Sequence, residues 1–146
     1  MYLAEKVDQL RPLLVRPIEA TVTYHDNCCV GRRCECYEPP RELLRLIPGL
    51  KLVEMPRNRE IALCCGGGGG MWLDGHIVEH GGRRLSDERV LEAASTGAKI
   101  LAVSCPFELS RFEDSIKVTG LEGKLVVRDI IELLAESMGL EERKRA

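Results

Sequence analysis

The 146-residue chain has few aromatic residues and no excess of positive charge. It contains one Trp, three Tyr and two Phe, which are too few for a platform on which nucleic-acid bases could stack. Its 21 Lys and Arg residues are balanced by 23 Asp and Glu residues, giving a net charge of -2. The basic excess that binds a phosphate backbone is therefore missing. We expect no nucleic-acid partner.

The chain also has no long apolar run. Charged residues recur throughout the first ten positions, which argues against a secretory signal, and no stretch approaches the length of a membrane span. We expect a cytoplasmic protein, with any membrane contact made through partners. In that compartment thiols stay reduced, so clustered cysteines more often bind metal or carry redox chemistry than form disulfides.

Strand-like and helix-like patterns alternate along the chain, and 45% of the residues are hydrophobic, enough for one core. Strands are expected at residues 20–24, 50–55, 100–103 and 125–127. Helices are expected at residues 3–10, 39–47, 86–97 with Ser86 as N-cap, from 106 onward with Phe107 and Phe112 partly inward, and 129–138. Continuous apolar strands between helices predict an α/β fold, a small parallel sheet flanked by helices. The expected division is an N-terminal helical arm (1–16), one metal-binding domain (17–140) and a charged tail (141–146).

Seven cysteines stand out, and an odd number fits a closed disulfide framework poorly. Cys28 lies four residues after the first expected strand, Cys64 and Cys65 follow the second, and Cys105 directly follows the third. The carboxyl ends of parallel strands meet at one edge of a sheet, where ligands gather. We therefore expect these four thiols to converge on one metal site.

The adjacent pair Cys64 and Cys65 bears on the kind of metal. Neighbouring side chains diverge and rarely reach a single zinc ion together, whereas an iron–sulfur cluster offers several iron atoms. The glycines that follow, among them Gly66, Gly67 and Gly68, supply backbone N–H groups that can donate to sulfur. Cys105 precedes Pro106 at an expected helix start, where the helix dipole favours a thiolate.

Other candidate residues are weaker. His25, beside Asp26, is expected to be a hydrogen-bonded loop histidine, and His76 and His80 are expected in a surface loop because glycines surround them. Arg32, Arg57 and Arg59 could face the metal or a partner, or be solvated. The remaining cysteines, expected to line a loop or serve as spare ligands, are Cys29, Cys34 and Cys36.

Several motifs together resemble a known family. They are His25-Asp26-Asn27-Cys28, Tyr37-Glu38-Pro39-Pro40, Met55-Pro56-Arg57-Asn58, Cys64-Cys65-Gly66-Gly67 and Ser104-Cys105-Pro106-Phe107. The chain resembles the cysteine-rich CCG domain of heterodisulfide reductase subunits B and D and of the iron–sulfur subunits of glycolate and glycerol-3-phosphate dehydrogenases. The resemblance implies a Rossmann-like half of such a protein, with a [4Fe–4S]-type cluster. One departure is Glu108, which stands where the family has the second cysteine of Cys-x-x-Cys.

The resemblance implies an electron-transfer subunit of a heterodisulfide-reductase-like or flavin-dehydrogenase-linked oxidoreductase. Its expected partners are a second cysteine-rich or ferredoxin-like chain and a flavoprotein, and we expect an oligomer. Glu108 is expected one helical turn from Cys105, as a neighbour or labile ligand of the cluster or as a solvated side chain. The main alternative is a zinc-binding structural module that uses the same cysteines, and a third is a thiol–disulfide enzyme that uses Cys64 and Cys65 directly.

Overall fold

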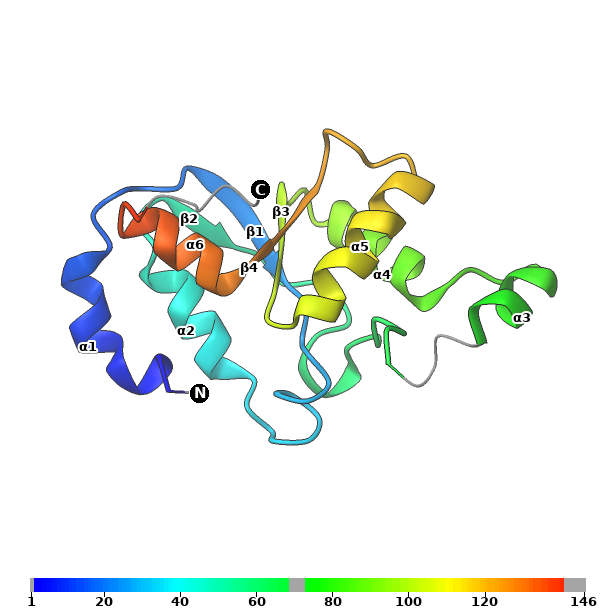
Figure 1. The fold of residues 1–146 in the computed structure, drawn as a ribbon, viewed down its shortest axis with the longest axis horizontal. Coiled ribbons are helices and arrows are strands. Elements are labelled where there is room, and N and C mark those ends of the chain that lie inside the picture. Colours follow the sequence, from blue (N-terminus) through cyan, green and yellow to red (C-terminus); the bar gives the residue numbers. More distant parts are fainter. Residues whose placement is uncertain (1, 69–72, 141–146) are drawn as a thin grey trace.

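A four-stranded sheet forms the centre of the molecule. The computed structural model describes residues 2–68 and 73–140, and its strands are β1 (Ala20–Tyr24), β2 (Leu50–Leu52), β3 (Ile100–Val103) and β4 (Val126–Asp129). All neighbouring strands are parallel, in the order β2-β1-β3-β4 (Figure 1). The predicted α/β fold with a small parallel sheet is confirmed.

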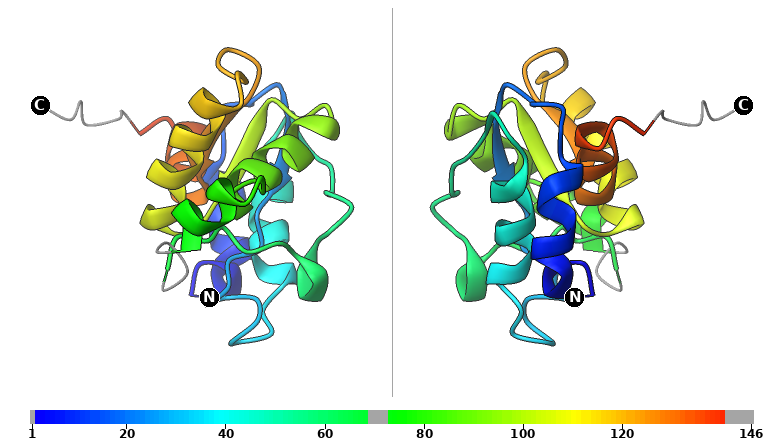
Figure 2. Two further views of the ribbon diagram at one scale, coloured as in Figure 1. Left: turned by 90° about the vertical axis from the view of Figure 1, so that its right-hand side faces the viewer. Right: turned by 90° about the vertical axis from the view of Figure 1, so that its left-hand side faces the viewer.

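Helices cover both faces of the sheet. The longer ones are α2 (Glu38–Leu46), α4 (Leu85–Ser95), α5 (Pro106–Val118) and α6 (Ile130–Ser137), and the shorter ones are α1 (Val7–Leu10) and α3 (Leu73–Glu79). Single turns of 3-10 helix are η1 (Ala4–Lys6), η2 (Arg11–Leu13) and η3 (Arg59–Ile61). Helices α1, α2 and α6 lie on one face, and α4 and α5 lie on the other (Figures 1 and 2).

Alternation along β3 divides the core into two parts. Ile100 and Ala102 pack with the α1, α2 and α6 side, whereas Leu101 and Val103 pack with α4 and α5. Successive side chains of a strand point to opposite faces, so a fully apolar strand is what a sheet covered on both sides requires. Among the described residues the core is mostly aliphatic, as the composition predicts.

The N-terminal arm packs on the same body as the rest of the chain. Leu10 and Leu14 are buried in the core on the α2 side, and the amide groups of Val15 and Arg16 donate to the carbonyl of Ser137 at the end of α6. The division into an arm and a domain stays a prediction. The charged tail, residues 141–146, lies outside the described residues, as do Gly69 and Gly70.

Four local predictions were wrong. The second strand ends at Leu52, because Glu54 turns to pair with Arg41 and Met55 enters the core beside α4 and α5. Helix α4 begins at Leu85 with Arg84 as N-cap, so Ser86 lies inside its first turn. The others, described below, concern Phe107 and the segment that contains His76.

No helix in the described ranges, 2–68 and 73–140, is long and apolar enough to cross a membrane.

Candidate metal centre

The carboxyl ends of β1 and β3 are joined side by side. Tyr24 pairs with Ala102 across the two strands, and the amide of His25 continues the ladder by donating to the carbonyl of Ala102 at 2.9 Å. One step further, the hydroxyl groups of Tyr24 and Ser104 lie 3.1 Å apart. The segment that leads to Cys28 therefore begins beside the segment that leads to Cys105.

Asn27 shapes the loop that carries Cys28. Its Oδ1 accepts hydrogen bonds from the amides of Cys29 at 2.8 Å and Val30 at 3.2 Å, and its carbonyl accepts from Gly31 at 2.7 Å. Such side-chain to backbone bonds favour a turn over continued strand. The chain consequently leaves the sheet immediately after β1, with Cys28 at the start of the turn.

Cys64 and Cys65 enter the site from the long connection after β2. The amide of Gly66 donates to Cys64 Sγ at 3.4 Å, and the amide of Gly67 donates to Cys65 Sγ at 3.3 Å. Gly66 has a φ of +67°, a conformation that side chains other than glycine rarely adopt. Both sulfurs thus face N–H groups, as the sequence predicts for the first two glycines, whereas the side-chain position of Gly68 opens onto empty space.

Cys105 is the N-cap residue of α5. Its backbone is extended, its carbonyl accepts the amide of Glu108 at 3.0 Å, and its side chain makes no capping hydrogen bond. The thiol therefore remains free at the positive end of a 13-residue helix, where negative charge is favoured. One turn later, α5 presents Glu108 on the buried side of the helix.

The thiols and Glu108 affect one another electrostatically. Burial raises the pKa of Cys65 to about 11, and the nearby carboxylate of Glu108 adds to the effect. Cys64 and Cys28 act on Cys65 in the same direction. Burial also raises the pKa of Cys28, with Cys29 as its strongest charged neighbour. Without a cation these two thiols stay protonated at neutral pH, whereas a bound metal ion would favour their thiolate forms.

Glu108 is buried although it carries an ionisable group, with 1% of its surface exposed. Its Oε1 accepts a hydrogen bond from Asn27 Nδ2 at 2.8 Å and lies 3.5 Å from His25 Nε2. Its Oε2 has no hydrogen-bond partner among the residues that the structure describes. One ligand atom from each of His25, Cys65 and Glu108 lies within 4.8 Å of the others, a spacing that could hold a metal ion. The expectation of a solvated Glu108 was wrong.

His25 is fixed from the opposite side of its ring. Arg89, on α4, donates from Nε to His25 Nδ1 at 3.0 Å, and the ring lies edge-on to Phe112 with centroids 4.9 Å apart. Both His25 and Arg89 are buried. The predicted hydrogen-bonded histidine is therefore present, but its partners are Arg89 and Glu108. Asp26, its sequence neighbour, instead pairs with Arg41.

The three arginines whose role the sequence left open make other contacts. Arg57 pairs with Glu92, Arg59 pairs with Glu38, and Arg32 donates to the carbonyl of Ala62. Cys34 and Cys36 lie in the turn that follows Cys28, where the thiol of Cys36 donates to the carbonyl of Cys34 at 3.3 Å. All seven cysteines are free thiols.

His76 and His80 lie on a helix and not in the predicted loop. His76 belongs to α3 and His80 follows directly, and the two rings lie 4.1 Å apart on an exposed surface. The ion pair between Asp74 and Arg111 ties this helix to α5, which offsets the cost of Gly75 within it. Tertiary contact thus overrides the local signal of the glycines.

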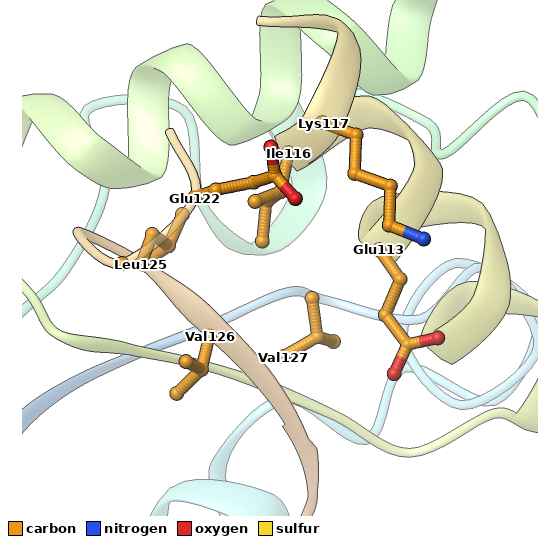
Figure 3. Close-up of a pocket in the computed structure, with 8 residues that line it drawn as sticks. Glu113, Ile116, Lys117, Glu122, Leu125, Val126 and Val127 are labelled. Atoms are coloured by element: carbon orange, nitrogen blue, oxygen red, sulfur yellow. The ribbon is translucent and has the colours of Figure 1, made fainter. Parts of the chain in front are cut away.

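Phe107 was expected to point partly inward, and it is 71% exposed, whereas Phe112 is fully buried. A groove of about 440 Å³ lies along α5 and β4, lined by Glu113, Ile116, Lys117, Glu122, Gly123, Leu125, Val126 and Val127 (Figure 3). It contains no cysteine or histidine. The chemically reactive residues are therefore gathered at the end of the sheet and not in this groove.

The donor set suits iron and sulfide. Thiolates are the usual protein ligands of iron–sulfur clusters, and adjacent cysteines such as Cys64 and Cys65 can bind different iron atoms. Two backbone N–H groups already face their sulfurs, and Glu108 Oε2 is a buried oxygen in the same place, without a partner in the described part of the chain. The residues present therefore fit such a group.

Comparison with known proteins supports this description. The family model of the CCG cysteine-rich domain matches residues 22–108, a range that runs from β1 through the start of α5 and includes the four candidate cysteines. The chain belongs to the CCG cysteine-rich domain family. The predicted resemblance is confirmed.

Curated relatives of this CCG chain are iron–sulfur or redox proteins by name. It is 41% identical over 134 residues to the "Probable iron-sulfur-binding oxidoreductase FadF" of Bacillus subtilis, covering 91% of this chain and 18% of that protein. It is 41% identical over 143 residues to a subunit of the dihydromethanophenazine:CoB--CoM heterodisulfide reductase of Methanosarcina mazei, covering 96% and 33%. It is 32% identical over 127 residues to "EtfAB:quinone oxidoreductase" of Syntrophomonas wolfei, covering 84% and 18%. The chain thus spans between a fifth and a third of these relatives.

Sequence reasoning missed the roles of Asn27 and Arg89. Asn27 lies inside the motif that ends at Cys28, so its position beside a ligand candidate was a usable signal. Arg89 lies 64 residues after His25 on an ordinary charged helix, and no local pattern marks it. Only the packing of α4 against the end of β1 brings its guanidinium to the histidine ring.

Proposed function

We propose that this chain is an electron-transfer subunit that holds a [4Fe–4S]-type iron–sulfur cluster through Cys28, Cys64, Cys65 and Cys105. The observation that carries the proposal is the adjacent pair Cys64 and Cys65, whose two sulfurs each receive a glycine N–H group. N–H donors favour the negatively charged sulfur atoms of a bound cluster and help to set its reduction potential. When bound, the cluster supplies one-electron redox chemistry.

The chain's own residues would bind this cluster and shield it. Ligands come from the loop after β1, the connection after β2 and the first position of α5, so the whole domain is needed to assemble them. The amides of Gly66 and Gly67, with Gly68 beside them, would line the sulfur atoms on one side, and Glu108 would lie on the buried side. The relatives named above, which include an oxidoreductase and a heterodisulfide reductase subunit, support this role.

We further propose that the chain works in an oligomeric complex inside the cytoplasm. The expected partners are a second cysteine-rich or ferredoxin-like chain and a flavoprotein that exchanges electrons with it. Relatives whose names describe a reductase subunit and an EtfAB:quinone oxidoreductase support partners of this kind. Light scattering of the metal-loaded protein, alone and with a candidate partner, tests this part: a monomer with full reductase activity would contradict it.

Anaerobic purification tests the cluster itself. We expect a brown protein that contains iron and acid-labile sulfide in similar amounts and is bleached by dithionite. A colourless protein with one zinc ion per chain would instead support the zinc-binding module. Metal-independent thiol–disulfide turnover that depends on Cys64 and Cys65 would support a dithiol enzyme.

A further inference from the structure

The carboxylate of Glu108 is buried, and no positively charged group of the described residues pairs with it. Its polar contacts there are Asn27 Nδ2, a neutral donor at 2.8 Å, and His25 Nε2 at 3.5 Å, both on Oε1. Its Oε2 is buried and has no partner within residues 2–68 and 73–140. Burying an unpaired carboxylate is strongly unfavourable, so the site calls for a cation beside Oε2.

His25 cannot be that cation. Arg89 Nε donates to His25 Nδ1 at 3.0 Å, and a guanidinium has N–H donors but no acceptor. His25 Nδ1 must therefore carry a lone pair, which makes the ring neutral with its proton on Nε2. The Nε2–H group then points to Glu108 Oε1, so Arg89 determines which atom of His25 faces the carboxylate.

The orientation of Asn27 is equally fixed. Its Oδ1 accepts the amides of Cys29 and Val30, so its Nδ2 is the end that faces Glu108. Two donors on one oxygen hold the carboxylate in a single orientation. Oε2 is then directed away from them, in the group of ligand atoms that includes Cys65.

We propose that Glu108 binds iron through Oε2, with His25 and Asn27 as positioning residues and Arg89 as the residue that fixes the His25 tautomer. This inference rests on the proposed function, because the iron belongs to the cluster held by the four cysteines. It makes Glu108 a fifth protein ligand of different chemistry. A carboxylate is harder than a thiolate, so the iron it binds should be the most readily exchanged.

Iron chemistry tests the ligand without any activity assay. The variant Glu108→Gln keeps the size of the side chain and an oxygen for Asn27, but removes the charge. Its matched control is Glu113→Gln, an exposed position on the same helix (Figure 3). We expect Glu108→Gln to lose iron to a chelator at least about tenfold faster than wild type, with Glu113→Gln within about twofold. Mössbauer spectra of wild type should show one iron site that is missing in Glu108→Gln.

A second variant tests the positioning residues and guards against misfolding of the first. Asn27→Asp keeps the oxygen that the Cys29 and Val30 amides need, but replaces the donor to Glu108 with a repelling carboxylate. It should speed iron loss about tenfold. It should add little in a protein that already carries Glu108→Gln, because both changes act on one interaction. Additive effects would show that Asn27 does not act through Glu108.

The outcomes separate the inference from the proposed function. A wild-type protein that binds no iron and sulfide overturns the proposed function, and the inference with it. A wild-type protein that holds the cluster, with the same Mössbauer spectrum and iron-loss rate in Glu108→Gln, overturns the ligand role of Glu108 alone. Loss of the distinct iron site in Glu108→Gln but not in Glu113→Gln supports it.

Discussion

Asp26 is held by a buried ion pair beside the metal centre. Arg41 donates to both of its carboxylate oxygens, at 2.7 and 2.9 Å, and the amide of Arg59 donates to Oδ2 at 2.7 Å. Burial alone would raise the pKa of Asp26, but these hydrogen bonds outweigh it and hold the pKa below its usual value. Asp26 thus orients the segment between β1 and Cys28 through polar contacts, without touching His25.

The lowered pKa of Asp26 predicts a dependence of stability on pH. A depressed carboxyl pKa contributes stability above the unfolded value, about 3.9, and that contribution is lost as pH falls through the folded value. Asp26→Asn should reduce the free energy of unfolding by about 2–3 kcal/mol at pH 7, with a smaller difference near pH 3. Urea unfolding at both pH values measures it, with the exposed Asp8→Asn as control. An equal difference at both pH values would contradict the assignment.

The four candidate cysteines differ from the others in what their replacement should do. Cys64→Ser and Cys105→Ser should each lower the iron content of the purified protein at least about tenfold, because a serine oxygen is a poor substitute for thiolate. Cys34→Ser is the matched control, since Cys34 is an exposed free thiol in the turn after Cys28. Iron and sulfide analysis decides the matter. Normal iron content in both Cys64→Ser and Cys105→Ser would remove them from the ligand set.

Among the elements, α5 does most to position the site. Glu108, Phe112 and Ile116 recur every four residues and are buried on one side of the helix, whereas Phe107 lies on the exposed side. Phe112 packs on the His25 ring and Ile116 lies in the core. The apolar anchoring of α5 therefore determines where the carboxylate of Glu108 lies.

Helix α6 begins with a capping box, which makes a second prediction at this scale. Asp129 accepts the amide of Ile131 at 2.8 Å, and Glu132 accepts the amide of Asp129 at 3.4 Å. Asp129→Ala leaves helix N–H groups without this acceptor and should cost about 1 kcal/mol. For a chain of this size that lowers the Tm by about 2–4 °C. Calorimetry of the metal-free protein measures the shift, and a Tm equal to that of Asp8→Ala would refute the role of the cap.

At the scale of the whole molecule, metal binding and folding should be coupled. The candidate ligands come from three segments separated by most of the sheet, so an ion or cluster would join the loop after β1 to the connection after β2 and to α5. Removing iron anaerobically with a chelator should lower the Tm by about 5–10 °C, the effect of a ligand that contributes about 3 kcal/mol. Calorimetry of the loaded and stripped protein measures this. The same treatment should leave the Tm of Cys64→Ser nearly unchanged, and an equal drop in that variant would point to damage by the chelator.

Much of the fold could be predicted from local patterns. β1 and β3 lie at the predicted residues, because a β-branched run and a fully apolar run allow few other structures in a sheet covered on both faces. The start of α5 at Pro106 and the Asp129 cap of α6 follow from chemistry within one helical turn. The placement of Cys28 and Cys105 after neighbouring strands was also within reach of the sequence.

The sequence by itself thus determined the α/β class, the cysteine motifs and the end of the sheet where they occur, since each depends on residues close together in the chain. Only the tertiary structure decided the neutral form of His25, the single free oxygen of Glu108 among the described residues and the helical state of the segment around His76. Each of these depends on a contact between distant residues: Arg89 with His25, Asn27 with Glu108, and Arg111 with Asp74. Hydrogen-bond direction and burial are properties of such contacts, so no local pattern encodes them.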